Sequence, residues 1–183
     1  MASLKSILST FLMANGTSSP AKHLPLARGC GEVNVLYTGL PGTHNLVAAQ
    51  GWDVEQVDRK IRKGHQDMIN AGYNVRTVLF GPEQNIDDLA REMDGINWGI
   101  TGVGFGVRGS TLEELIVEFE DILMTFRQKA LDSPTVFNYN PDSFLWSIQR
   151  RAPLSSDCAG SPGKNLGYVE ICQDECQNGE AKL

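Results

Sequence analysis

The chain has 183 residues, a length that fits one domain with a substantial buried core. Hydrophobic residues make up 41% of it and charged residues 21%, as in soluble globular proteins. The formal net charge of -6 and the isoelectric point near 5.0 argue against a nucleic-acid-binding surface, which needs clustered Lys and Arg. No apolar run approaches the roughly 20 residues that span a bilayer, so we expect neither nucleic acid nor a membrane among its partners.

The first 20 residues carry apolar side chains at helical spacing. This spacing predicts a short amphipathic helix that covers the domain or contacts a partner subunit. A targeting sequence is the less favoured interpretation, because a long unbroken apolar stretch and a small-x-small cleavage site are missing. Residues 14–31 are rich in Gly, Ser and Pro, which is typical of a linker. We therefore assign 1–31 to an N-terminal amphipathic segment and linker.

The regular pattern starts with the apolar run at 32–40, which predicts a buried strand. Asp53, with Gln56 three residues later, has the arrangement of a capping box and predicts the start of a helix. Gly72 is expected to end that helix. The next apolar run, at 73–82, predicts the second strand.

A shorter helix is predicted between Ile86 and Met93, and a glycine-rich third strand at 96–106. The clearest helix of the chain follows, with a capping box expected from Ser110 with Glu113 or from Thr111 with Glu114. Its apolar face comprises Leu112, Leu115, Ile116, Phe119, Ile122, Leu123 and Phe126.

A fourth strand is predicted at 134–141, and Asp142 is expected to cap the last helix, which carries Phe144. From Pro153 onward the chain is polar and rich in Gly, so 153–183 is predicted to be a tail that is partly disordered. The segment 32–152 is therefore expected to form a single α/β domain.

Strand and helix alternate at spacings that suit right-handed parallel crossovers. The prediction is a three-layer α/β fold with a four-stranded parallel sheet in the flavodoxin-like or Rossmann-like order 2-1-3-4. Its switch point then lies between the first and third strands. Because so narrow a sheet has an exposed edge, a homo-oligomer that covers this edge or the helical faces is expected.

The four cysteines, Cys30, Cys158, Cys172 and Cys176, do not follow the spacing of a zinc site, so no metal is predicted. A disulfide within the tail from Cys158 to Cys176 is left open. Free thiols in a reducing cytosol are favoured, and with them a cytoplasmic location.

Ligands of open α/β sheets bind beyond the carboxyl ends of the strands, at the switch point. Residues 104–111, GFGVRGST, contain Gly104, Gly106 and Gly109 in the G-x-G-x-x-G order of a dinucleotide site. They follow the third strand instead of the first, and the acidic residue that would hold the ribose is missing. We therefore predict no nucleotide and no other cofactor.

An anion site is the alternative that these residues favour, because glycines allow close backbone approach and a helix N-terminus attracts anions. Arg108 adds a two-pronged cation, and His44, in the loop after the first strand, is a candidate general acid or base. The opposing interpretations are equally simple: the glycines only turn the chain, Arg108 pairs with a surface acid, and His44 is an exposed loop residue. The residues predicted to contact the ligand are Gly104, Phe105, Gly106, Arg108, Ser110, Thr111, Asn138, Asn140 and Asp142.

Several short motifs occur together in about two-thirds of the chain. They are Gly39-Leu40, Ala71-Gly72-Tyr73, the G-x-G-V-R stretch Gly104–Arg108, Phe119-Glu120, the Phe137–Asp142 stretch and Arg150-Arg151. In these motifs the chain resembles a family of small α/β proteins of unknown function found in bacteria and fungi. The resemblance implies the same fold and a constellation of Arg108, Glu120, Asn138 and Asp142, but no activity.

Two functions are expected from the sequence. The first is a cofactor-independent enzyme of the lyase, isomerase or cyclase type, or a binding protein, for an anionic organic metabolite at the switch point. His44 and Arg108 would be its catalytic residues. The second is a non-catalytic module that oligomerises or binds another protein.

Overall fold

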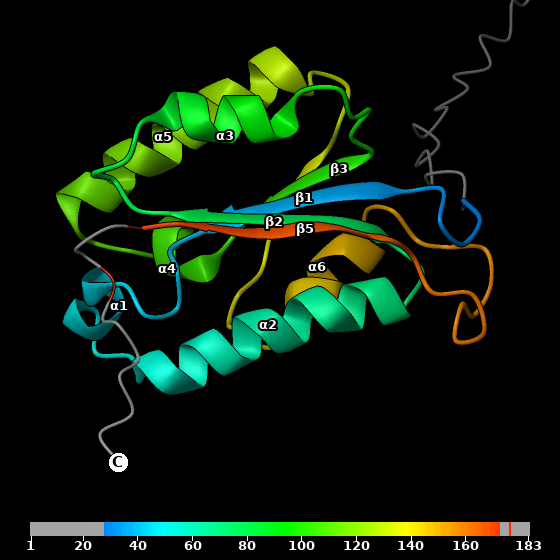
Figure 1. The fold of residues 1–183 in the computed structure, drawn as a ribbon, viewed down its shortest axis with the longest axis horizontal. Coiled ribbons are helices and arrows are strands. Elements are labelled where there is room, and N and C mark those ends of the chain that lie inside the picture. Colours follow the sequence, from blue (N-terminus) through cyan, green and yellow to red (C-terminus); the bar gives the residue numbers. More distant parts are fainter. Residues whose placement is uncertain (1–27, 173–175, 177–183) are drawn as a thin grey trace, which may run out of the picture.

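The computed structural model describes residues 28–172 and Cys176 (Figure 1). The amphipathic helix predicted for the first 20 residues lies outside these residues, as does most of the predicted linker. In the described part of the chain, no helix is both long enough and apolar enough to cross a membrane.

A single all-parallel sheet forms the middle layer, with its strands in the order β4-β3-β1-β2-β5. The strands are β1 (Asn34–Gly39), β2 (Asn74–Phe80), β3 (Ile100–Val103), β4 (Thr135–Phe137) and β5 (Asn165–Ile171).

The predicted strand number is wrong, because the sheet has a fifth strand. Strands β1 to β4 follow the expected order 2-1-3-4, so the switch point does lie between β1 and β3. Strand β5 comes from the region predicted to be a polar tail. It pairs with β2, at the edge opposite β4, whereas a flavodoxin-like sheet continues outward from its fourth strand.

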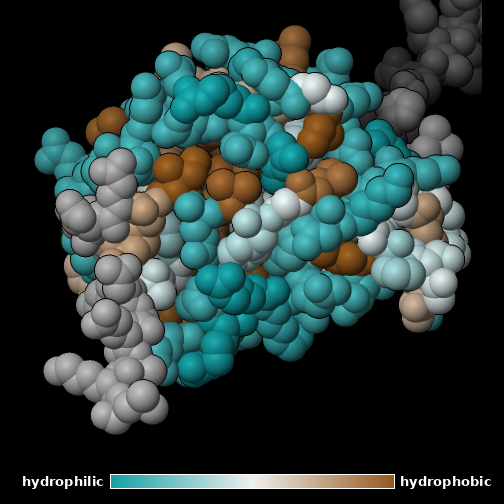
Figure 2. Space-filling view, in the orientation of Figure 1, coloured by the Kyte–Doolittle hydropathy of each residue, from teal (hydrophilic) through white to brown (hydrophobic). Residues whose placement is uncertain are grey.

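Helices cover both faces of the sheet (Figure 1). Helices α2 (Val54–Asn70) and α6 (Phe144–Gln149) lie on the lower face in this view, and α3 (Ile86–Met93) and α5 (Glu113–Lys129) lie on the upper face. This is the predicted three-layer arrangement. Figure 2 shows that the outer surfaces of both helical layers are hydrophilic, while apolar side chains reach the surface in a band between them.

Two short helices stand at the carboxyl end of the sheet, in stretches predicted to be loops. They are α1 (Asn45–Ala49) and α4 (Phe105–Arg108). Each is only about one turn long, which is too short for an apolar period to reveal it in the sequence. Half of the GFGVRGST stretch, Phe105–Arg108, is therefore helical, and its Gly104 is the N-cap of α4.

The helix caps agree with the predictions only in part. Asp53 caps α2 as expected, accepting the Gln56 N–H at 2.9 Å. The capping boxes predicted for α5 are wrong: its N-cap is Leu112, which makes no side-chain cap. The cap predicted for α6 is wrong as well, because the N-cap position is held by Ser143 and not by Asp142.

Side chains of β1 alternate between two separate cores. Val35 and Tyr37 belong to the core under α2 and α6, and Leu36 belongs to the core under α3 and α5. Because both faces of the sheet are covered, the central strands are nearly continuous apolar runs. This explains why β1 and β2 were recognisable from sequence.

The segment that leads into β5 is fastened to the domain by the disulfide Cys30–Cys158. A second disulfide joins Cys172 to Cys176, and no cysteine of the chain is free. The expectation of free thiols is therefore wrong. Sequence spacing could not indicate the first bridge, because its half-cystines lie 128 residues apart and only the folded chain brings them together.

Candidate functional site

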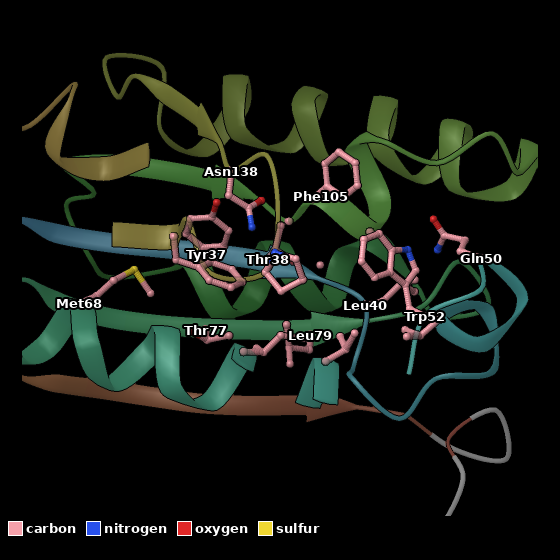
Figure 3. Close-up of a pocket in the computed structure, with 18 residues that line it drawn as sticks. Tyr37, Thr38, Leu40, Gln50, Trp52, Met68, Thr77, Leu79, Phe105 and Asn138 are labelled. Carbon is pink, nitrogen blue, oxygen red and sulfur yellow. The ribbon is translucent and has the colours of Figure 1, made fainter. Parts of the chain in front are cut away.

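A pocket opens at the carboxyl ends of β1 and β3, on the face of the sheet that α2 and α6 cover. It holds about 660 Å³ of empty space, part of which is open to solvent. Figure 3 shows Trp52 and Gln50 at one end and Met68 at the other, with Tyr37 and Thr38 between them. The lining residues are Tyr37, Thr38, Gly39, Leu40, Val47, Gln50, Trp52, Val57, Ile61, Met68, Thr77, Leu79, Gly104, Phe105, Gly106, Asn138, Pro141 and Phe144.

Tyr37 forms part of the pocket wall, and its ring is held from two sides. A Cβ at Gly102 of β3 would lie 2.5 Å from the ring, so only glycine allows this approach. The ring of Phe144 meets it edge-on with 4.8 Å between centroids, and the hydroxyl lies 3.4 Å from Ser147 Oγ. Tyr37 is therefore a fixed wall of the pocket, because it is packed on both sides and hydrogen-bonded.

The polar groups of the pocket gather where β1 and β4 end. Thr38 Oγ1 donates to the Val78 carbonyl at 2.7 Å, so the hydroxyl proton of this side chain is already used. Asn138 is 1% exposed, and its Nδ2 donates to the Asn140 carbonyl at 2.8 Å. Its Oδ1 is buried and has no hydrogen-bond partner among the described residues. A buried acceptor without a donor is costly unless a ligand or water supplies one.

Arg108 lies behind this polar end and does not line the pocket. Its Nη2 donates to the Asn138 carbonyl at 2.9 Å, and its guanidinium carbon lies 5.0 Å from the centroid of the Phe105 ring. Its Nε is buried, with no acceptor within the described part of the chain. Arg108 therefore positions two lining residues, Asn138 and Phe105.

Two positive charges act on Tyr37 in the pocket wall. Burial raises the pKa of Tyr37 well above its usual value, while the positive charges of Arg108 and Arg150 oppose that rise. The described residues that line the pocket include no Asp, Glu, His, Lys or Arg. The site thus offers shape, a few polar groups and positive charge nearby, but no acid or base that titrates near neutral pH.

Four of the predicted contact residues line this pocket: Gly104, Phe105, Gly106 and Asn138. The others serve the local structure or are exposed. Ser110 Oγ accepts the Leu112 N–H at 3.1 Å. The Asn140 carbonyl accepts from Asn138, and the Asp142 carboxylate pairs with Lys60 at 2.7 Å. Thr111 and Glu120 are exposed.

His44, predicted to act as an acid or base, lies outside the pocket lining and is 1% exposed. Its Nδ1 accepts the Leu46 N–H at 3.2 Å as the N-cap of α1. The ring proton therefore sits on Nε2, which lies 3.2 Å from Glu83 Oε2 and donates to it. Both ring nitrogens are thus occupied by structural contacts.

His44 and Glu83 also lie near a sulfur. The ligand atoms of His44, Glu83 and Cys172 all fall within 4.8 Å of one another, which is a spacing that a metal could bridge. The donors do not suit a metal, however. Cys172 is held in a disulfide, and His44 Nε2 carries the ring proton because Nδ1 accepts from the backbone.

Sequence reasoning missed most of the apolar lining. Trp52 follows α1, and Ile61 and Met68 lie on the apolar stripe of α2, a spacing that predicts ordinary core packing. Only the switch-point rule pointed to the correct end of the sheet.

Comparisons with protein-family models, with curated proteins and with solved structures found no significant match to this chain. The resemblance based on short motifs therefore stays a prediction. Of its four proposed constellation residues, only Arg108 and Asn138 are joined by a direct hydrogen bond.

Proposed function

We propose that the protein binds a small organic acid with an apolar body at the switch-point pocket. The observation that carries this proposal is the combination of an apolar lining with Asn138 Oδ1, a buried acceptor that has no donor among the described residues. A bridging water that donates one hydrogen bond to Asn138 Oδ1 and another to the ligand carboxylate would supply that donor.

The composition of the pocket suits such a ligand. Its lining is mainly apolar and aromatic, as it is in small-molecule sites. Burying the apolar body of a ligand against these side chains would supply most of the binding free energy. The few polar groups would fix its orientation.

Two features favour a negatively charged head group near α4. The positive charges of Arg108 and Arg150 act on the Tyr37 hydroxyl in the pocket wall. Among the described residues, the lining contains no carboxylate, so no negative side chain in the pocket wall would repel an anion. We therefore expect the carboxylate of the ligand beside Gly104–Gly106 and its apolar body against Trp52 and Leu40.

A catalytic version of the proposal, a cofactor-independent lyase, isomerase or cyclase, needs a proton donor or acceptor within hydrogen-bond reach of the ligand. His44 and Arg108 lie outside the lining, so a catalytic role for either would require them to move. Binding is therefore the better-supported function. Enzymatic activity stays a prediction, as do the interaction module and the homo-oligomer.

The test blocks the pocket at Gly106. A Cβ added there meets nothing within 4 Å, so Gly106→Leu should fill space in the pocket without clashing with the backbone. Gly160 has equally open surroundings and does not line the pocket, which makes Gly160→Leu the matched control. We expect octanoate to bind the native protein and the control, and to bind the blocked variant at least about tenfold more weakly, by isothermal titration calorimetry.

Octanol, which has the same apolar body without the charge, tests the head group. Weaker binding of octanol than of octanoate supports the organic acid. Equal binding of octanoate to all three proteins, or no binding of either compound, would contradict the proposal.

The cytoplasmic location also stays a prediction. Two disulfides favour an oxidising compartment over the cytosol, because cytosolic thiols are kept reduced. Thiol labelling of the protein in extracts of its native source distinguishes the two.

A further inference from the structure

A second hollow lies on the opposite face of the sheet, between α5 and the loop that joins β2 to α3. It holds about 730 Å³ of empty space, part of which is open to solvent. It shares no lining residue with the switch-point pocket. Its lining residues are Phe80, Pro82, Gln84, Ile86, Glu113, Glu114, Val117, Glu118 and Asp121.

Glu118 is the unusual member of this lining. It is only 5% exposed, and neither of its carboxylate oxygens has a hydrogen-bond partner among the described residues. A buried carboxylate is normally paired with a cation or with several donors, because removing its charge from water is costly. The residues that the structure describes around Glu118 supply no such partner.

The neighbours of Glu118 increase this negative charge. Glu114 and Asp121 lie one turn away on the same face of α5, and Glu113 and the Gln84 amide complete the polar side. None of the described residues in this lining is Lys, Arg or His. The hollow therefore presents hydrogen-bond acceptors and negative charge, and a cation is the partner that its described residues lack.

The rest of the lining favours an organic cation over a metal ion. Phe80, Ile86 and Val117 provide an apolar surface beside the carboxylates. Within the described residues, the one group of three metal-ligating side chains with closely spaced ligand atoms is His44, Glu83 and Cys172, and none of these lines the hollow. A divalent ion needs its oxygen ligands at roughly 2.0–2.6 Å, which dispersed carboxylates do not supply.

We propose that this hollow binds an alkylammonium ion. Its ammonium group pairs with the buried carboxylate of Glu118 and with Asp121, and its short alkyl chain packs against Phe80 and Val117. Ammonium groups on alkyl stems combine these two kinds of contact, since the stem packs on apolar surface while the charged end is hydrogen-bonded. This site is independent of the proposed organic-acid pocket.

The test measures binding of cadaverine to the full chain by isothermal titration calorimetry at low ionic strength and about pH 9, where the Glu118 carboxyl is ionised and cadaverine is still protonated. We expect saturable binding to the native protein, at least about tenfold weaker binding to Glu118→Gln, and no binding of neutral pentanol. Asp132→Asn removes one exposed carboxylate that does not line the hollow, and it should bind cadaverine as the native protein does.

Asp121→Asn provides a second variant in case Glu118→Gln fails to fold, because Asp121 is exposed and lines the same hollow. It should also weaken binding, whereas equal binding to native protein, Glu118→Gln and Asp121→Asn would overturn the proposal. Displacement of cadaverine by equimolar magnesium would overturn it too, since the hollow would then be a metal site.

Discussion

At the scale of single residues, Glu118 should make stability depend on pH. Burial raises the pKa of Glu118 to about 8, and the charges of Glu83 and Asp121 add to the rise. The folded protein therefore holds this proton more tightly than the unfolded chain, whose pKa is near the ordinary 4.5. The protonated Glu118 therefore contributes its full stabilisation below the pKa of the unfolded chain, and this stabilisation is lost as the pH rises toward the pKa of the folded protein. Over that range the free energy of unfolding falls by up to about 1.4 kcal/mol per pH unit.

The measurement is urea unfolding of native protein and Glu118→Gln across this pH range. We expect the free energy of unfolding of the native protein to fall relative to the variant as pH rises. Burial lowers the pKa of His65, so this residue destabilises the folded protein as the pH falls below the ordinary histidine pKa, which is the opposite pH dependence to that of Glu118. The His65 contribution is the same in both proteins and cancels when their free energies of unfolding are compared. Parallel curves would show that Glu118 ionises normally.

Arg108 has a structural role that its sequence position does not reveal. The sequence alone predicts that Arg108→Ala abolishes ligand binding or turnover with little effect on the melting temperature. In the structure the guanidinium donates to the Asn138 carbonyl and lies over Phe105, so we expect a loss of about 1–3 kcal/mol in stability as well.

Thermal unfolding and octanoate titration of Arg108→Ala and Arg108→Lys check this expectation. Lysine keeps the positive charge but lacks the planar fork, so it should restore part of the octanoate affinity and little of the stability. An unchanged melting temperature in Arg108→Ala would contradict the positioning role.

At the scale of elements, β5 depends on contacts that lie far apart in the sequence. The segment before β5 passes so close to the backbone of Tyr73 that a Cβ at Gly163 would overlap the Tyr73 carbonyl oxygen. The Gly163 N–H donates to the Ile69 carbonyl at 2.8 Å. Farther along, the Tyr168 ring packs against Arg62 and His65 of α2.

The disulfide that anchors this segment should contribute strongly to stability. Replacing Cys30 and Cys158 by Ser together should lower the free energy of unfolding by about 2–5 kcal/mol, because a bridge that closes so long a loop restricts the unfolded chain. Urea unfolding of the double variant measures this loss. The pair Cys172 and Cys176 closes a loop of separation 4, so its removal is the control and should cost less.

These contacts explain which elements could be predicted from sequence. The helix after Asp53 and strands β1 and β2 carry their signals locally, as a cap and as apolar periods. Strand β5 is half-exposed, and its pairing with β2, the disulfide and the surface of α2 place it in the sheet. The Ser-, Gly- and Pro-rich residues at 153–163, which precede it, give the segment as a whole the composition of a tail.

The candidate site was predictable in its position but not in its character. Topology placed Gly104, Phe105, Gly106 and Asn138 at the switch point, and all four line the pocket. Burial, however, depends on packing across the whole domain. A sequence cannot show that His44 would be enclosed with both ring nitrogens occupied, or that Trp52 would face a cavity.

At the scale of the whole molecule, the two pockets lie on opposite faces of one sheet and share no lining residue. Each ligand that binds only the folded state should raise stability by an amount set by its own concentration and dissociation constant. Octanoate and cadaverine together should therefore raise the free energy of unfolding by the sum of their separate effects. The measurement is urea unfolding with each compound alone and with both at the same free concentrations. Since β1 and β2 between the pockets are closely packed, a shift in one core could reach the other. An excess or deficit above about 1 kcal/mol would contradict independence and would show that the sheet couples the two sites.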